Sequence, residues 1–73
     1  MKAKVEKLIG LMREAGLYYI RDLAEAASIS PSGAGKVVRG MNVNEDTMRK
    51  VAKSVGVKLT DIVVLDAEGR VVE

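Results

Sequence analysis

The sequence predicts a mainly α-helical protein, a compact bundle of four to five short helices that ends in a C-terminal β-hairpin. Two successive segments carry apolar residues at the spacing of an amphipathic helix, and two more begin at helix start signals. A glycine or a short break follows each of the four. In residues 61–73 this spacing gives way to β-branched runs on both sides of a turn. The chain has 73 residues, the size of one small domain, and its only aromatic residues are 2 tyrosines, so we expect an aliphatic core.

The first two helices are predicted from their apolar stripes. Residues 2–15 are expected to form a helix that ends at Gly16, a residue suited to a left-handed cap. The stripe of this helix consists of Val5, Leu8, Ile9 and Met12. Residues 19–27 are expected to form a second, shorter helix with the same spacing, and a brief break follows at residues 28–30.

The next two helices are predicted from their start signals. Ser30 and Pro31 favour a helix over residues 31–39, because a serine hydroxyl accepts a hydrogen bond from an unpaired amide and proline at the first position has no amide to leave unpaired. Asn44 is the expected cap of a fourth helix over residues 45–55. Glycine follows each of these two helices and is expected to end it.

The C-terminal residues are predicted to leave the helical pattern. Residues 59–62 have room for one helical turn. The apolar runs 62–65 and 70–72 flank the turn sequence Asp-Ala-Glu-Gly, which indicates a hairpin. We therefore divide the chain into a helical bundle over residues 1–60 and a hairpin over residues 61–73 that belongs to the same domain.

The composition excludes much of catalysis. The chain contains no cysteine and no histidine, so it lacks thiolate nucleophiles, imidazole bases and the usual zinc ligands. No convergent set of nucleophile, base and oxyanion donor is visible, and we expect a non-enzymatic protein without a cofactor or a metal. No apolar run reaches the roughly 18 residues of a membrane helix. Together with the missing cysteines, this predicts a cytoplasmic location and no membrane partner.

Residues 19–27 and 31–39 have the layout of a helix-turn-helix, two short helices joined by a turn. Such a motif binds DNA because the major groove, about 12 Å wide, admits one helix, whose short polar side chains reach base edges while lysine and arginine contact phosphates. The second predicted helix carries such side chains on one side, at Ser30, Ser32, Lys36 and Arg39. In the alternative interpretation, the two basic residues are solvated surface charges.

Three stretches of the sequence resemble the Cro/repressor-like (XRE-type) helix-turn-helix family. They are LAEAASIS at residues 23–30, KVVRG at residues 36–40 and VNEDTMRKVAKSVGV at residues 43–57. The likeness extends over roughly residues 8–63. It implies a lambda-repressor-like bundle of five helices in which residues 31–39 form the recognition helix.

The same resemblance assigns DNA contacts to particular residues. They are Ser30, Ser32, Gly35, Lys36 and Arg39, together with Asn42 in the loop after the recognition helix. Arg21, near the start of the preceding helix, supplements the phosphate contacts in one interpretation and is a solvated charge in the other. Ser28 stands where the family usually has glycine, so we expect a serine in a turn conformation there. Gly33 and Gly35 leave the reading face with few side chains, which favours shape-based readout.

The predicted hairpin is expected to be a dimerisation surface. A two-stranded ribbon is marginal in water, and this one would expose an apolar set. The set consists of Ile62, Val63, Val64, Leu65, Val71 and Val72. A second copy would cover it and place two recognition helices about 34 Å apart, much as phage Cro proteins dimerise through C-terminal strands. In the alternative interpretation, the ribbon packs on its own helices.

The middle of the chain has an excess of basic residues, and its last segment has an excess of acidic ones. Residues 28–58 hold 6 basic against 2 acidic residues. The acidic residues of the last segment, which would keep it away from phosphates, are Asp61, Asp66, Glu68 and Glu73.

These inferences predict a sequence-specific regulator of transcription, a repressor, that binds double-stranded DNA as a homodimer and is associated with the nucleoid. A second hypothesis is a protein–protein interaction module, such as an antitoxin or an adaptor, that uses the same bundle and hairpin to hold another protein. Salt-insensitive binding of a protein, without binding of DNA, would favour the second hypothesis.

Overall fold

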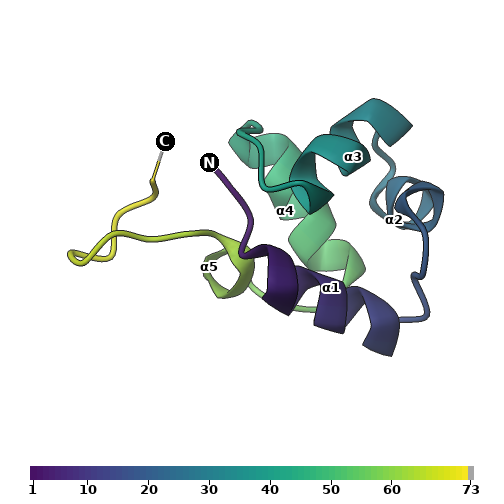
Figure 1. The fold of residues 1–73 in the computed structure, drawn as a ribbon, viewed down its shortest axis with the longest axis horizontal. Coiled ribbons are helices and arrows are strands. Elements are labelled where there is room, and N and C mark those ends of the chain that lie inside the picture. The colour runs from purple at the N-terminus through teal and green to yellow at the C-terminus, as the bar shows by residue number, and fades with distance from the viewer. Residues whose placement is uncertain (73) are drawn as a thin grey trace.

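A computed structural model describes residues 1–72, which contain five α-helices (Figure 1). They are α1 (Val5–Glu14), α2 (Ile20–Ala27), α3 (Pro31–Val38), α4 (Glu45–Ser54) and α5 (Leu59–Ile62). The prediction of a compact, mainly helical protein is confirmed, and α3 and α4 begin at the predicted residues. Glu73, one of the acidic residues expected at the C-terminal end, lies outside the described residues.

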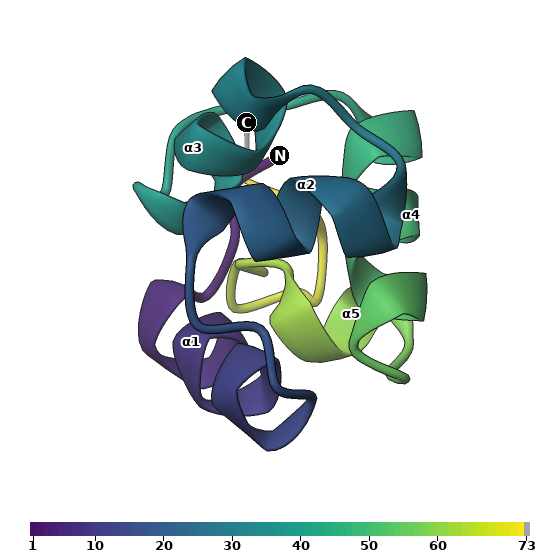
Figure 2. The same cartoon turned by 90° about the vertical axis from the view of Figure 1, so that its right-hand side faces the viewer.

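The helices enclose an aliphatic core. Helix α2 packs against α3 and α4, α1 packs against α3 and α5, and α4 packs against α5. Figure 2 shows α2 across the front, with α3 above it and α1 below it on the left, and α4 and α5 on the right. The largest fully buried side chains are Leu8, Leu23, Val37, Met48, Val51, Ile62 and Val63. No polar or charged side chain is buried within residues 1–72, so apolar burial is the main source of the stability of the core.

The connection between α2 and α3 confirms the expected turn at Ser28. This serine has a left-handed backbone with φ 56°, and the amide of Ile29 donates to the carbonyl of Ala24 at 3.0 Å. Such a bond closes the end of a helix, a position where glycine is usual because it has no Cβ. The serine therefore holds the turn at some cost in backbone strain.

The predicted helix over residues 2–15 is too long at its start, because residues 1–4 are extended. The amide of Lys4 donates to the carbonyl of Ile62 at 2.7 Å, and the amide of Val64 donates to the carbonyl of Lys2 at 2.9 Å. Val43 donates in the same way to the carbonyl of Met1 at 2.9 Å. These bonds to distant parts of the chain, together with the burial of Met1 and Ala3, outweigh the local helical preference.

The predicted hairpin is not confirmed. Residues 62–72 form an isolated antiparallel bridge between Leu65 and Val71, and the structure assigns no strand of regular length within residues 1–72. The turn itself is well defined, because the carboxylate of Asp66 accepts from the amides of Glu68 and Arg70 at 3.0 and 2.8 Å. Figure 1 shows this segment as an arm that extends away from the helices.

Two residues of the expected dimerisation surface belong to the core. Ile62 and Val63 are 0% exposed, and Ile62 lies in α5. The expectation for these two is corrected, because fully buried side chains have no surface to offer a second copy. Val64, Leu65 and Val72 are half-buried, and Val71 is 36% exposed.

None of the helices within residues 1–72 combines the length and the apolar character that crossing a bilayer requires.

Candidate nucleic-acid interface

Helix α3 divides its side chains between the core and the surface. Ala34 and Val37 are fully buried. Ser32, Lys36 and Arg39 are all exposed, and their spacing of four and three residues places them in one stripe along α3 and its C-terminal cap. The structure thus brings together three of the predicted site residues, which we call the α3 stripe.

Ser30 lies just before this stripe and holds the start of the helix. Its Oγ accepts a hydrogen bond from the amide of Gly33 at 3.0 Å. Its hydroxyl is therefore engaged in capping, and the residue stays exposed at the helix start.

Gly35 does not lie at the surface as expected, since it is buried under the side chain of Arg39. A Cβ atom added to Gly35 would lie 3.1 Å from Nη1 of Arg39. The guanidinium therefore folds back along the helix and covers the glycine, and an added Cβ would make it shift by a few tenths of an ångström. The expectation that Gly35 contacts DNA is corrected: in this structure it provides the space in which Arg39 lies.

Asn42 lies near the α3 stripe, in the loop between α3 and α4. It is exposed, and together with Lys36, Gly33 and Thr47 it lines a surface hollow between the two helices. This hollow ends at the first turn of α4, where the side chain of Asn44 accepts from the amide of Thr47 at 2.8 Å. The structure therefore places a loop amide beside the lysine of the stripe.

Arg21 lies apart from the stripe, at the start of α2. Its guanidinium carbon is 5.3 Å from the centre of the Tyr19 ring, a distance typical of a cation–π contact. The carboxylate of Asp22 accepts from the amides of Tyr18 and Tyr19 at 3.2 and 2.9 Å. The amides of Tyr18 and Tyr19 already donate to this carboxylate. The group at the start of α2 that offers a positive charge to a phosphate is therefore the guanidinium of Arg21.

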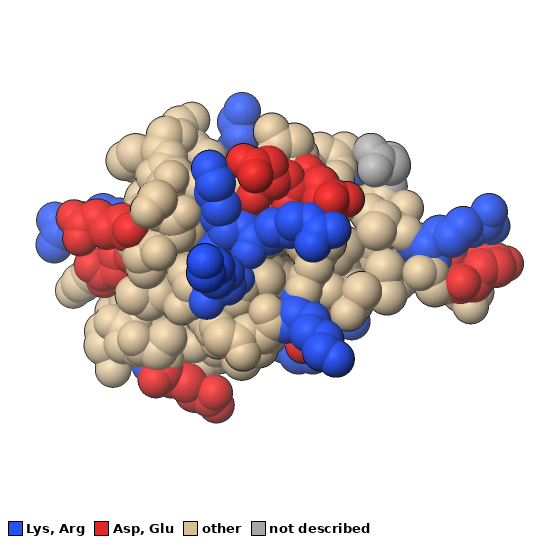
Figure 3. All heavy atoms as spheres, turned by 180° about the vertical axis from the view of Figure 1, so that it is seen from behind, with Lys and Arg blue, Asp and Glu red and all other residues tan. Residues whose placement is uncertain are grey.

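A second cationic region, which was not predicted as a site from the sequence, lies on the face formed by α4 and the start of α5. Figure 3 shows lysine and arginine side chains gathered in the middle of the face opposite to that of Figure 1, and Figure 2 places α4 and α5 on that side. The signal was present in the sequence, because residues 47–60 hold four basic residues and no acidic one. They are Arg49, Lys50, Lys53 and Lys58, which we call the α4 cluster.

Residues 1–72 contain no group of three or more potential ligands close enough to hold an ion. The basic side chains of both cationic regions can form ion pairs and donate hydrogen bonds.

A comparison of the chain with protein-family models, with curated proteins and with solved structures finds no match. The likeness to the helix-turn-helix family accordingly rests on the residues of the sequence itself.

Proposed function

We propose that the protein is a sequence-specific double-stranded-DNA-binding regulator of transcription, with α2 and α3 as a helix-turn-helix and α3 as its recognition helix. The observation that carries the proposal is the α3 stripe: Ser32, Lys36 and Arg39 are exposed on one side, while Ala34 and Val37 are buried on the other. A helix of 8 residues is about 12 Å long, short enough to lie within one major groove.

Each residue of the stripe has a separate role in this proposal. Ser32 lies near the start of α3, where side chains of a recognition helix reach base edges. Lys36 and Arg39 lie farther along, where their charges meet the phosphates on the two sides of the groove. Asn42 follows in the loop and donates to the backbone of the duplex.

The exposed arm supports the further proposal that the regulator is a homodimer. The arm carries four apolar residues that are not fully buried: Val71 is exposed, and Val64, Leu65 and Val72 are half-buried. A second copy that pairs with this arm would remove them from water and add the strands that an isolated ribbon lacks. A two-fold dimer of this kind reads two half-sites about 34 Å apart, so its binding sites are palindromic.

The experiment that tests the proposal is selection of bound duplexes from a random pool, followed by titration of the recovered site. We expect palindromic sites and an affinity that falls steeply with salt. The double variant Lys36→Ala/Arg39→Ala should lose at least about tenfold in affinity and reduce the slope of log K against log salt by about 2.

The matched control is Lys7→Ala, which removes one exposed charge from α1. Unchanged duplex affinity and salt slope in the double variant, or an equal loss in the control, would contradict the proposed face.

A further inference from the structure

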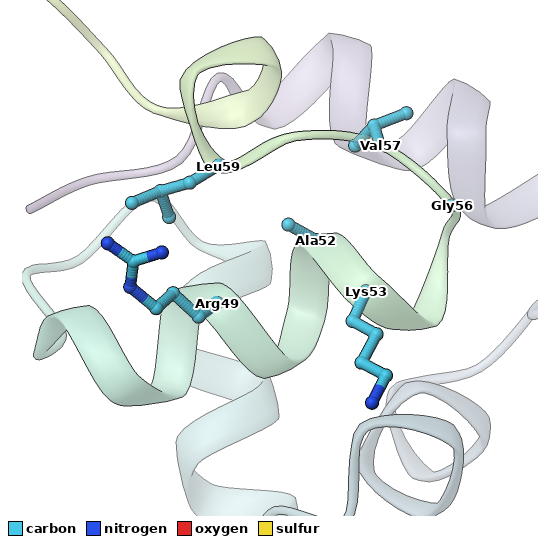
Figure 4. A pocket seen from close by; sticks show the side chains of 6 residues that line it. All are labelled: Arg49, Ala52, Lys53, Gly56, Val57 and Leu59. Carbon is cyan, nitrogen blue, oxygen red and sulfur yellow. The ribbon is translucent and has the colours of Figure 1, made fainter.

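A hollow lies between α4 and the start of α5, on the face that carries the α4 cluster. It is lined by Arg49, Ala52, Lys53, Gly56, Val57 and Leu59 (Figure 4). Its volume of about 350 Å³ is near the lower end of the range for binding pockets, about 300–1,000 Å³. The space is thus suited to one or two side chains rather than to a large ligand.

The floor of this hollow is apolar and its shape is set by the backbone. Gly56 has φ +75°, which lets the chain turn back sharply after α4. The amide of Val57 then donates to the carbonyl of Ala52 at 3.0 Å, and this bond holds the two residues together. Val57 and Leu59 are half-buried, so part of their aliphatic surface faces the hollow. The hollow is preformed in the free protein.

The rim of the hollow is positively charged. Arg49 and Lys53 are one helical turn apart on α4 and both line the hollow. In Figure 4 the guanidinium of Arg49 lies beside Leu59, and the side chain of Lys53 extends in the opposite direction, away from the floor. Arg49 forms an exposed ion pair with Glu45 at 2.8 Å. Lys53 forms no ion pair within residues 1–72. Exposed pairs contribute at most about 1 kcal/mol, so a carboxylate from outside can compete for Arg49 and can bind Lys53 directly.

We propose that this hollow is a docking site for an acidic peptide segment of another protein. One aliphatic side chain of the segment enters the hollow against Ala52, Val57 and Leu59. Carboxylates on either side of that residue pair with Arg49 and Lys53. Both parts of the site are used by such a partner, since the floor gains from apolar burial and the rim from opposite charge.

Nucleic acid fits this site less well. A phosphate backbone pairs with cations but has no aliphatic group for the floor, so the apolar part of the hollow would stay unoccupied. The hollow and α3 have no residue in common, and in Figure 2 the turn between α4 and α5 lies at the lower right while α3 lies at the upper left. A duplex on the α3 stripe therefore leaves the hollow open, and the proposal does not depend on the proposed DNA binding.

The test is selection of a random dodecapeptide phage library on the immobilised protein, followed by titration of the recovered peptides by fluorescence anisotropy. We expect recovered sequences with an aliphatic residue close to two or more acidic residues. Lys53→Glu should weaken their binding at least tenfold. Lys7→Glu, which makes the same change of charge at an exposed position of α1, should leave it within twofold.

Two further measurements separate the proposal from simpler explanations. Replacing the aliphatic residue of the peptide by serine should weaken binding at least fivefold, and equal binding would reduce the site to a charged surface and overturn the proposal. A duplex of random sequence should bind Lys53→Glu as it binds the wild type, and a tenfold loss would make this face a nucleic-acid surface instead.

The proposal is also overturned by a selection that recovers no peptides, by recovered peptides that lack acidic or aliphatic residues, or by binding that Lys53→Glu leaves unchanged. Each of these outcomes leaves duplex binding by Lys36 and Arg39 to be judged by its own experiment.

Discussion

Helices α3 and α4 both begin at a polar cap but are stabilised in opposite ways. Ser30 caps α3 and Asn44 caps α4. Beyond the cap, α4 has acidic residues in its first turn and two ion pairs at i,i+4 spacing, at 2.8 and 3.2 Å. Helix α3 has neither, and two of its eight residues are glycine. The difference is that α4 is stabilised partly by interactions within the helix itself, whereas α3 depends more on packing against its neighbours.

The helix proposed to read DNA is held mainly by packing. Each glycine costs up to about 1 kcal/mol relative to alanine in a helix, whereas each ion pair of α4 adds a few tenths. Burial of Ala34 and Val37 against the core offsets the cost in α3. Helix α3 is therefore expected to open more readily than α4 when that packing is weakened.

The largest effect is expected from Leu23→Ala, which breaks the support of α3. Leu23 is 0% exposed and lies in α2, the helix against which α3 packs. Loss of its side chain leaves a cavity that costs about 2–5 kcal/mol, a large part of the stability of a small domain. Urea denaturation followed by circular dichroism measures it. A loss of unfolding free energy within about 0.5 kcal/mol, the range of an exposed substitution such as Lys7→Ala, would show that α3 does not depend on packing against α2.

A smaller effect is expected from removal of the caps. Ser30→Ala and Asn44→Ala each delete one hydrogen bond to an amide in the first turn, at about 1 kcal/mol in global stability. Hydrogen exchange should separate the two variants. Protection is expected to fall throughout α3 in the first variant and only in the first turn of α4 in the second, because α4 keeps its ion pairs. Equal loss of protection along both helices would contradict the comparison.

The smallest effect on stability is expected from Gly35→Ala, which gives α3 some of the helical preference of α4. Alanine should raise the unfolding free energy by up to about 1 kcal/mol. The new Cβ atom lies 3.1 Å from Nη1 of Arg39, so the guanidinium must shift by a few tenths of an ångström. Under the proposed function, duplex affinity should fall severalfold, measured by fluorescence anisotropy.

The matched control for this substitution is Gly10→Ala in α1, where a Cβ atom meets nothing within 4 Å. We expect a similar gain in stability there and no change in duplex affinity. Equal affinities of the two variants would show that the position of Arg39 over Gly35 has no part in binding.

The parts of the fold that follow from local chemistry were predictable from the sequence. Ser30 with Pro31 and Asn44 mark the starts of α3 and α4, because capping involves residues three positions apart. The exposure of Ser32, Lys36 and Arg39 likewise follows from helical spacing, once the buried side is identified.

The parts that depend on distant contacts were not predictable. Nothing within residues 2–4 signals an extended backbone, since its hydrogen bonds come from residues 62 and 64. An apolar run such as residues 62–65 does not reveal which of its members face the core. Gly35 is buried because the side chain of Arg39 folds over it, and the spacing of residues in the sequence does not predict the conformation of a side chain.

The extended residues 1–4 have a consequence for the order of folding. They pair with Val43 on one side and with residues 62–64 on the other, so the contact between Ala3 and Val63 closes a loop of nearly the whole chain. Contacts between residues so far apart in the sequence form late, because closing the long loop between them costs conformational entropy before the contact adds any stability. Residues 1–4 are thus among the last to find their partners, and a chain that stops before Ile62 lacks the residues that pair with them and part of the core.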